Sequence, residues 1–150
     1  MIEATVAKWH QHLRGELPGG LDELLHDDVV FYSPIVFTPQ RGKDVTKLYL
    51  GAAGKTLGGD GPAEAAEGGS GSGKFRYRTE ICQGNHAMLE FETTMDGRYV
   101  NGIDILTCDD DGLITEFKVM IRPLQAIEAV HGQMREMLEL MGSGGAATLT

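Results

Sequence analysis

The segment Asn101–Pro123, NGIDILTCDDDGLITEFKVMIRP, contains two strand-like runs joined by an acidic turn. Its first run places one carboxylate, Asp104, among apolar residues. Because the side chains of a strand alternate between its two faces, Asp104 shares a face with Gly102 and Leu106, and Ile103 lies on the opposite face. A carboxyl group on an apolar sheet face is either solvated or buried for a reason, so Asp104 is the first candidate for a functional residue.

Further strand-like runs, separated by pairs of turn-forming residues, precede this segment in the sequence. The strand-like runs are 75–82, 86–95, 99–109 and 113–121, and the pairs Gly84-Asn85, Asp96-Gly97 and Asp111-Gly112 separate them. Each pair contains a residue that readily adopts the positive φ of a tight hairpin. The sequence therefore predicts an antiparallel meander of four strands.

The segments on either side of the meander are predicted to be mainly helical, because apolar residues recur in them every three or four positions. The predicted helices cover 2–17, 21–25, a segment that begins at Gly42, and 124–141, and a further strand covers 29–32. Helices followed by a curled antiparallel sheet indicate an α+β fold in which the helices pack on one face of the sheet.

One part of the chain has almost no large apolar side chains. Residues 58–73 read GGDGPAEAAEGGSGSG, and we expect a mobile surface loop there because so little burial could offset the entropy of ordering. Residues 143–150 are expected to form a disordered tail. With 150 residues and 41% hydrophobic content, the range 1–142 fits a single domain with one core.

Charge and composition narrow the expected partners and location. The net charge is −9 and the basic residues are scattered, which argues against binding to nucleic acid. The N-terminal stretch carries charges among its apolar residues, so we expect no signal peptide, no membrane partner and a cytoplasmic location. Cys82 and Cys108 lie without CxxC spacing and are expected to be reduced.

Short motifs for cofactors and metals do not fit. The run GAAGKT lacks a phosphate-loop glycine, because Tyr49 stands five positions before Gly54. If Gly112 of the DDDG run is aligned with the sixth position of a calcium loop, Thr107 is first and Lys118 is twelfth, where carboxylate ligands are required. The run is therefore interpreted as a hairpin turn. His10 and His12 are two residues apart on a helix and are interpreted as solvated surface histidines. We therefore expect neither a cofactor nor a metal.

Three stretches in this order resemble the nuclear transport factor 2-like (NTF2-like) superfamily, in particular its SnoaL-like and ketosteroid isomerase-like branch. They are DDVVFYSP at 27–34, RGKDVTKLYL at 41–50 and GIDILTCDDDGLI at 102–114. The resemblance covers about residues 3–123. It implies a cone in which helices pack on a curved antiparallel sheet and enclose a pocket.

The resemblance also implies site residues. Isomerases of the family use a base on the first strand, a tyrosine on the first helix and a protonated aspartic acid on the fourth strand. Matched position by position, Asp104 corresponds to the acid, Ser33 to the base and Trp9 to the tyrosine. A serine without a neighbouring histidine cannot take a proton from carbon, and an indole N–H can only donate. Steroid isomerisation by the family's usual mechanism is therefore not expected.

Two functions remain open. The first is an isomerase- or cyclase-type enzyme that acts on a small apolar, carbonyl-bearing molecule with Asp104 as acid or acid/base; the second is a binding module that uses the same pocket without turnover. Epoxide-hydrolase-like chemistry ranks last, since the first strand offers no carboxylate past Asp28. The expected ligand-binding residues are Trp9, Ser33, Tyr49, Phe117, Val119 and Ile121. Ile103 and Ile105 are expected to form the outer sheet face of a homodimer.

Overall fold

The structure, a computed structural model, describes residues 1–56 and 74–141. Its elements in chain order are α1 (Ile2–Leu13), α2 (Gly20–Leu24), β1 (Leu25–Tyr32), β2 (Gln40–Arg41), α3 (Lys43–Thr56), β3 (Arg76–Gln83), β4 (His86–Met95), β5 (Arg98–Cys108), β6 (Ile114–Arg122) and α4 (Leu124–Met141). The expected loop at 58–73 and tail at 143–150 lie outside the described residues. None of the helices in the described part of the chain is long and apolar enough to cross a membrane.

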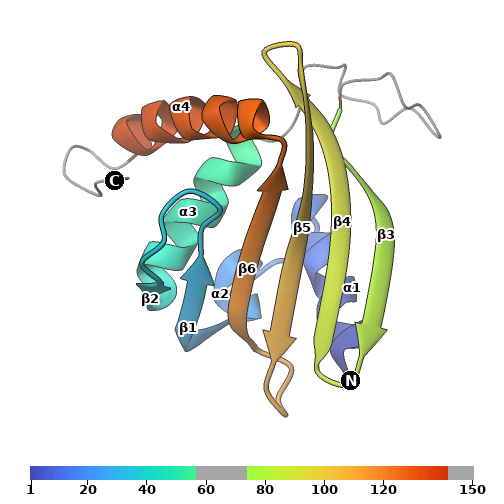
Figure 1. Cartoon of the computed structure of the whole chain (residues 1–150). Coiled ribbons are helices and arrows are strands. Elements are labelled where there is room, and N and C mark those ends of the chain that lie inside the picture. Colours follow the sequence, from blue (N-terminus) through green and yellow to red (C-terminus); the bar gives the residue numbers. More distant parts are fainter. Residues whose placement is uncertain (57–73, 142–150) are drawn as a thin grey trace.

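The six strands form one curved sheet in the order β2-β1-β6-β5-β4-β3. Strands β3 to β6 are the predicted antiparallel meander. β1 joins β6 in parallel, so the sheet is mixed rather than purely antiparallel. Figure 1 shows α1, α2 and α3 behind one face of the sheet and α4 across its upper end. The α+β architecture expected from the sequence is confirmed.

Strand β5 places its side chains as the alternation predicts. Gly102, Asp104 and Leu106 are buried on the inner face, toward the helices, whereas Ile103 and Ile105 remain partly exposed on the outer face. In β6, Phe117 and Val119 are likewise buried, whereas the next residue, Met120, is exposed. The inner face of the sheet therefore carries the core and, within it, one carboxyl group.

The first helix is shorter than the predicted range 2–17. It ends at Leu13, because Gly15 adopts a φ of 73° and its N–H donates to His12 O at 2.9 Å. The next N–H, of Glu16, donates to Gln11 O at 2.8 Å and closes the last turn. The glycine therefore ends the helix before the predicted end at Leu17.

Strand β3 contains a bulge that turns its side chains. Tyr77 pairs with Phe91, and Thr79 pairs with Glu90, so two steps along β3 oppose one step along β4. The extra residue is Arg78. Tyr77 and Glu80, three residues apart, consequently both face α1, where Tyr77 meets Trp9 and Glu80 meets His10.

Candidate functional site

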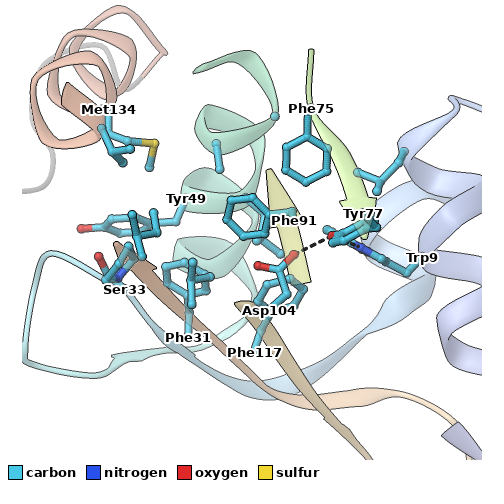
Figure 2. Close-up of a pocket in the computed structure, with 18 of the residues that line it drawn as sticks. Trp9, Phe31, Ser33, Tyr49, Phe75, Tyr77, Phe91, Asp104, Phe117 and Met134 are labelled. Carbon is cyan, nitrogen blue, oxygen red and sulfur yellow. Dashed lines mark hydrogen bonds between the residues drawn. The ribbon is translucent and has the colours of Figure 1, made fainter. Parts of the chain in front are cut away.

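A cavity of about 430 Å³ lies between the inner face of the sheet and helices α1, α3 and α4. This volume is in the range of small-molecule binding sites. Aromatic side chains form much of its wall (Figure 2), namely Trp9, Phe31, Tyr49, Phe75, Tyr77, Phe91 and Phe117. The cavity is thus apolar over most of its surface and offers few polar groups to a ligand.

The residues that the sequence analysis named as site residues all line this cavity. They are Asp104, Trp9, Ser33, Tyr49, Phe117, Val119 and Ile121. Their side chains come from five elements or their ends, which the fold brings together around one space. Their catalytic or binding roles stay predictions.

Asp104 is the one carboxyl group among the described residues that line the cavity, and it is 6% exposed. Its Oδ2 accepts a hydrogen bond from the Tyr77 hydroxyl at 2.5 Å. Its Oδ1 makes no hydrogen bond with a described residue and is directed away from Tyr77 toward the rest of the cavity (Figure 2). Burial raises the pKa of Asp104 to about 7, against a smaller lowering by the Tyr77 hydrogen bond. Protonated and ionised Asp104 therefore coexist near neutral pH.

Tyr77 is a site residue that the sequence analysis missed. Its hydroxyl accepts a hydrogen bond from Trp9 Nε1 at 2.9 Å and donates to Asp104. Burial, together with the charge of Asp104, raises the pKa of Tyr77 well above its usual value, so the phenol keeps its proton. A signal was available, because Phe75 and Tyr77 alternate on a strand of the same meander, but the bulge that aims Tyr77 was not predicted.

Gly102 makes room for one wall of the site. A Cβ atom at this position would lie 2.4 Å from Cζ of Phe91 and 2.7 Å from the carbonyl oxygen of Met120. The Phe91 ring occupies that space, and Tyr77 packs against it edge to face with ring centroids 6.3 Å apart. The glycine two positions before Asp104 is therefore required by a close aromatic contact.

Ser33 follows the end of β1 and caps the turn after it. Its Oγ accepts hydrogen bonds from the backbone N–H groups of Ile35 at 2.9 Å and Val36 at 3.2 Å. Both lone pairs of the hydroxyl are thereby engaged, so Ser33 can donate its proton into the cavity but cannot accept one. These hydrogen bonds make Ser33 a turn residue and exclude it as a base.

The histidines of α1 are not the solvated surface residues that the sequence suggested. His10 and His12 both line the cavity and are only partly exposed. His10 contacts the Glu80 carboxylate, and the His12 ring lies 5.5 Å from that of Trp9. Burial lowers the pKa of His12, so its imidazole is uncharged at neutral pH. Both histidines border the cavity together with Trp9 and Leu13 of the same helix.

One more histidine, His131 of α4, lines the cavity and accepts a hydrogen bond from Arg135 at 3.2 Å through Nε2. Within residues 1–56 and 74–141, no group of three or more His, Cys, Asp or Glu side chains is placed to hold a metal ion.

The chain is similar to several proteins of known structure. No protein-family model matches the chain, and no curated protein matches it. The steroid delta-isomerase of Pseudomonas aeruginosa is 30% identical, with 95% of each chain covered and a TM-score of 0.80. A Silicibacter pomeroyi protein with a cystatin-like fold is 25% identical, with 91% of this chain and 84% of that one covered and a TM-score of 0.68. An NTF2-like protein of Mesorhizobium loti, 16% identical over 81% of this chain and 91% of its own, shares the fold with a TM-score of 0.63.

Proposed function

The chain belongs to the nuclear transport factor 2-like superfamily, among its ketosteroid isomerase-like members, and we propose that it is an isomerase-type enzyme acting on a small apolar, carbonyl-bearing molecule. In this proposal Asp104 is the acid or acid/base. The observation that carries it is the environment of that carboxyl group, which is buried, held through Oδ2 by Tyr77 and directed through Oδ1 into an apolar cavity.

The protonated form of Asp104 suits a carbonyl substrate. Because Oδ2 accepts from Tyr77, the proton of the neutral carboxyl resides on Oδ1, where it donates to a carbonyl oxygen in the cavity. That hydrogen bond strengthens as negative charge develops on the oxygen, and a dry apolar wall strengthens it further. The C–H next to the carbonyl becomes more acidic, which is the first requirement for moving a double bond.

When protonated Asp104 acts as the hydrogen-bond donor, the proton acceptor for that C–H must be another side chain, and Ser33 cannot accept a proton. The imidazoles of His10, His12 and His131 line the same cavity. Of these, His12 is the first candidate, because its lowered pKa keeps the ring uncharged and able to take a proton at neutral pH. The protonated ring then returns that proton to the γ-carbon, which completes the migration of the double bond.

The alternative function, a binding module without turnover, is favoured by the state of Ser33. Its hydroxyl oxygen is fully engaged by two backbone N–H groups, so the position that corresponds to the family's base holds no base. In this alternative Asp104 fixes a polar group of the ligand and the aromatic walls bury the remainder.

The test uses a β,γ-unsaturated ketosteroid and its one-ring analogue cyclohex-3-en-1-one, because migration of either double bond yields a conjugated enone that absorbs in the ultraviolet. We expect turnover by the wild-type protein and a fall of about 10²- to 10⁴-fold in Asp104→Asn, which keeps the shape but cannot transfer a proton. Asp110→Asn, in the exposed turn between β5 and β6, is the matched control and should leave turnover unchanged.

Binding of the fluorescent phenol 2-naphthol separates the alternatives. If the protein is an enzyme, the Asp104→Asn variant should still bind 2-naphthol but should turn over the two ketones poorly. A binding module should turn over neither ketone and should lose affinity only in Asp104→Leu, which removes both carboxyl oxygens. If Asp104→Leu changes neither turnover nor binding, Asp104 is a structural residue and both functions are wrong.

A further inference from the structure

Tyr77 reaches Asp104 across an intervening strand. Tyr77 lies on β3 and Asp104 on β5, and β4 lies between these two strands in the sheet. The Tyr77 hydroxyl nevertheless lies 2.5 Å from Asp104 Oδ2. The residue of β4 that pairs with Tyr77 is Phe91, so the phenol extends beside the Phe91 ring to the carboxyl group (Figure 2). A small tilt of so long a side chain would displace its hydroxyl from Oδ2, and the ring therefore needs support.

Three rings surround the Tyr77 ring, and each lies nearly perpendicular to it. The centroids of His10, Phe75 and Phe91 lie 5.5, 5.1 and 6.3 Å from that of Tyr77, at interplanar angles of 85°, 86° and 84°. Phe75 and Phe91 also stack on each other, with centroids 5.0 Å apart. Edge-to-face contacts of this kind are favourable. The three rings form a cage that restricts the tilt of Tyr77.

Two members of the cage are themselves held in place. Phe91 is 1% exposed, and its ring extends over Gly102, where a Cβ atom would lie 2.4 Å from Cζ. The Phe91 ring thus leans toward β5 and leaves room for the phenol beside β3. His10 contacts the carboxylate of Glu80, which faces α1 because of the bulge in β3. The glycine and the bulge therefore both contribute to the cage.

We propose that the three rings of the cage are positioning residues, which hold Tyr77 so that its hydroxyl donates to Oδ2 of Asp104 and leaves Oδ1 to a ligand. They act on the carboxyl group through Tyr77. This role rests on the proposed function, because Oδ1 is the atom assigned to the substrate carbonyl. The hydrogen bond from Tyr77 can be followed without a substrate, so the two proposals are tested separately.

Phe91→Leu tests the cage, because leucine is apolar but removes the flat ring beside Tyr77. The short hydrogen bond deshields the Tyr77 hydroxyl proton, and we expect its NMR signal to move upfield in the variant. We also expect the pKa of Asp104, from an NMR titration of its carboxyl carbon, to rise by about 0.5, since a weaker hydrogen bond lowers it less. Phe75→Leu removes a second ring of the cage and should shift both signals in the same direction.

A double-mutant cycle with Tyr77→Phe separates positioning from other effects of the smaller side chain. In the Tyr77→Phe background, Phe91→Leu has no hydrogen bond to weaken and should no longer raise the pKa of Asp104. Met95→Ala is the matched control, because Met95 is buried on the same face of β4 as Phe91 but does not line the cavity. It should lower the thermal midpoint without moving either NMR signal.

Two results would overturn the positioning role. One is that both signals stay unchanged in Phe91→Leu and in Phe75→Leu. The other is that Phe91→Leu raises the pKa of Asp104 equally with and without the Tyr77 hydroxyl. Neither result concerns turnover, so the proposed function would stand. Conversely, the expected NMR shifts in a protein that converts neither ketone would support the cage while overturning the proposed function.

Discussion

The Tyr77 hydroxyl lies 2.5 Å from Asp104 Oδ2 while it accepts the indole N–H of Trp9 at 2.9 Å. An indole nitrogen can only donate, so the single proton of Tyr77 points to Asp104. The direction of both hydrogen bonds is therefore fixed from Trp9 through Tyr77 to the carboxyl group. Trp9, a wall residue by its position, also determines which oxygen of Asp104 carries the proton.

Tyr77→Phe should raise the pKa of Asp104 further, because the hydrogen bond from Tyr77 is the contact that lowers it. The measurement is an NMR pH titration of the side-chain carboxyl carbon of Asp104. Tyr99→Phe is the matched control, since its hydroxyl also donates to a carboxylate, Glu92 Oε2, at 2.7 Å but on the outer face. An unchanged or lowered Asp104 pKa in Tyr77→Phe would contradict the assigned direction of the hydrogen bond.

Asp104 should make the protein less stable as pH rises. Its folded-state pKa of about 7 exceeds the ordinary value of 3.8, so the unfolded chain ionises first. The resulting cost is absent below about pH 4, grows as pH rises to about 7, and then levels off at roughly 4 kcal/mol. Asp104→Asn still accepts from Tyr77 and does not titrate. Its unfolding free energy from urea melts should match that of the wild type at pH 4 and exceed it at pH 8.

The same melts on Asp110→Asn provide the control, because Asp110 lies exposed in the β5–β6 turn. A constant difference between Asp104→Asn and wild type from pH 4 to pH 8 would mean that burial does not raise the Asp104 pKa.

The face of Asp104 could be predicted from the sequence because strand alternation is a local rule, and the hairpin pairs on either side of β5 fix its limits. Tyr77 could not, since the bulge at Arg78 depends on how β3 pairs with β4, and pairing is not local. The histidines of α1 were misassigned for a related reason. Spacing on a helix gives the direction of each side chain, but not how far the neighbouring sheet curves around it.

Gly102→Ala should destabilise the protein by about 1–3 kcal/mol, because its Cβ would lie 2.4 Å from Phe91 Cζ and 2.7 Å from a backbone oxygen that cannot move freely. Gly132→Ala is the matched control. It lies in α4 with nothing within 4 Å of its Cβ position, so alanine should stabilise that helix by about 0.5–1 kcal/mol. Chemical denaturation of both variants gives the comparison. Equal effects would show that the Phe91 ring does not need the space over Gly102.

The outer face of the sheet is proposed to form a two-fold homodimer. Register aligns Ile81, Met88 and Ile105 in one row across the sheet and Ile103 with Met120 in another. Ile81 and Met120 are 57% and 51% exposed, an unusual concentration of apolar surface for a sheet face. A hollow of about 340 Å³ between these rows can receive side chains of a second copy.

In a two-fold dimer, Met120→Glu would bury two new carboxylates in the interface, one from each copy. The variant should therefore sediment as a monomer in sedimentation velocity at micromolar protein. Leu140→Glu is the matched control, because Leu140 is 79% exposed on α4, away from the sheet, and should leave the dimer intact. A wild-type protein that sediments as a monomer would contradict the proposal outright. A dimer that survives Met120→Glu but not Leu140→Glu would place the interface on α4 instead.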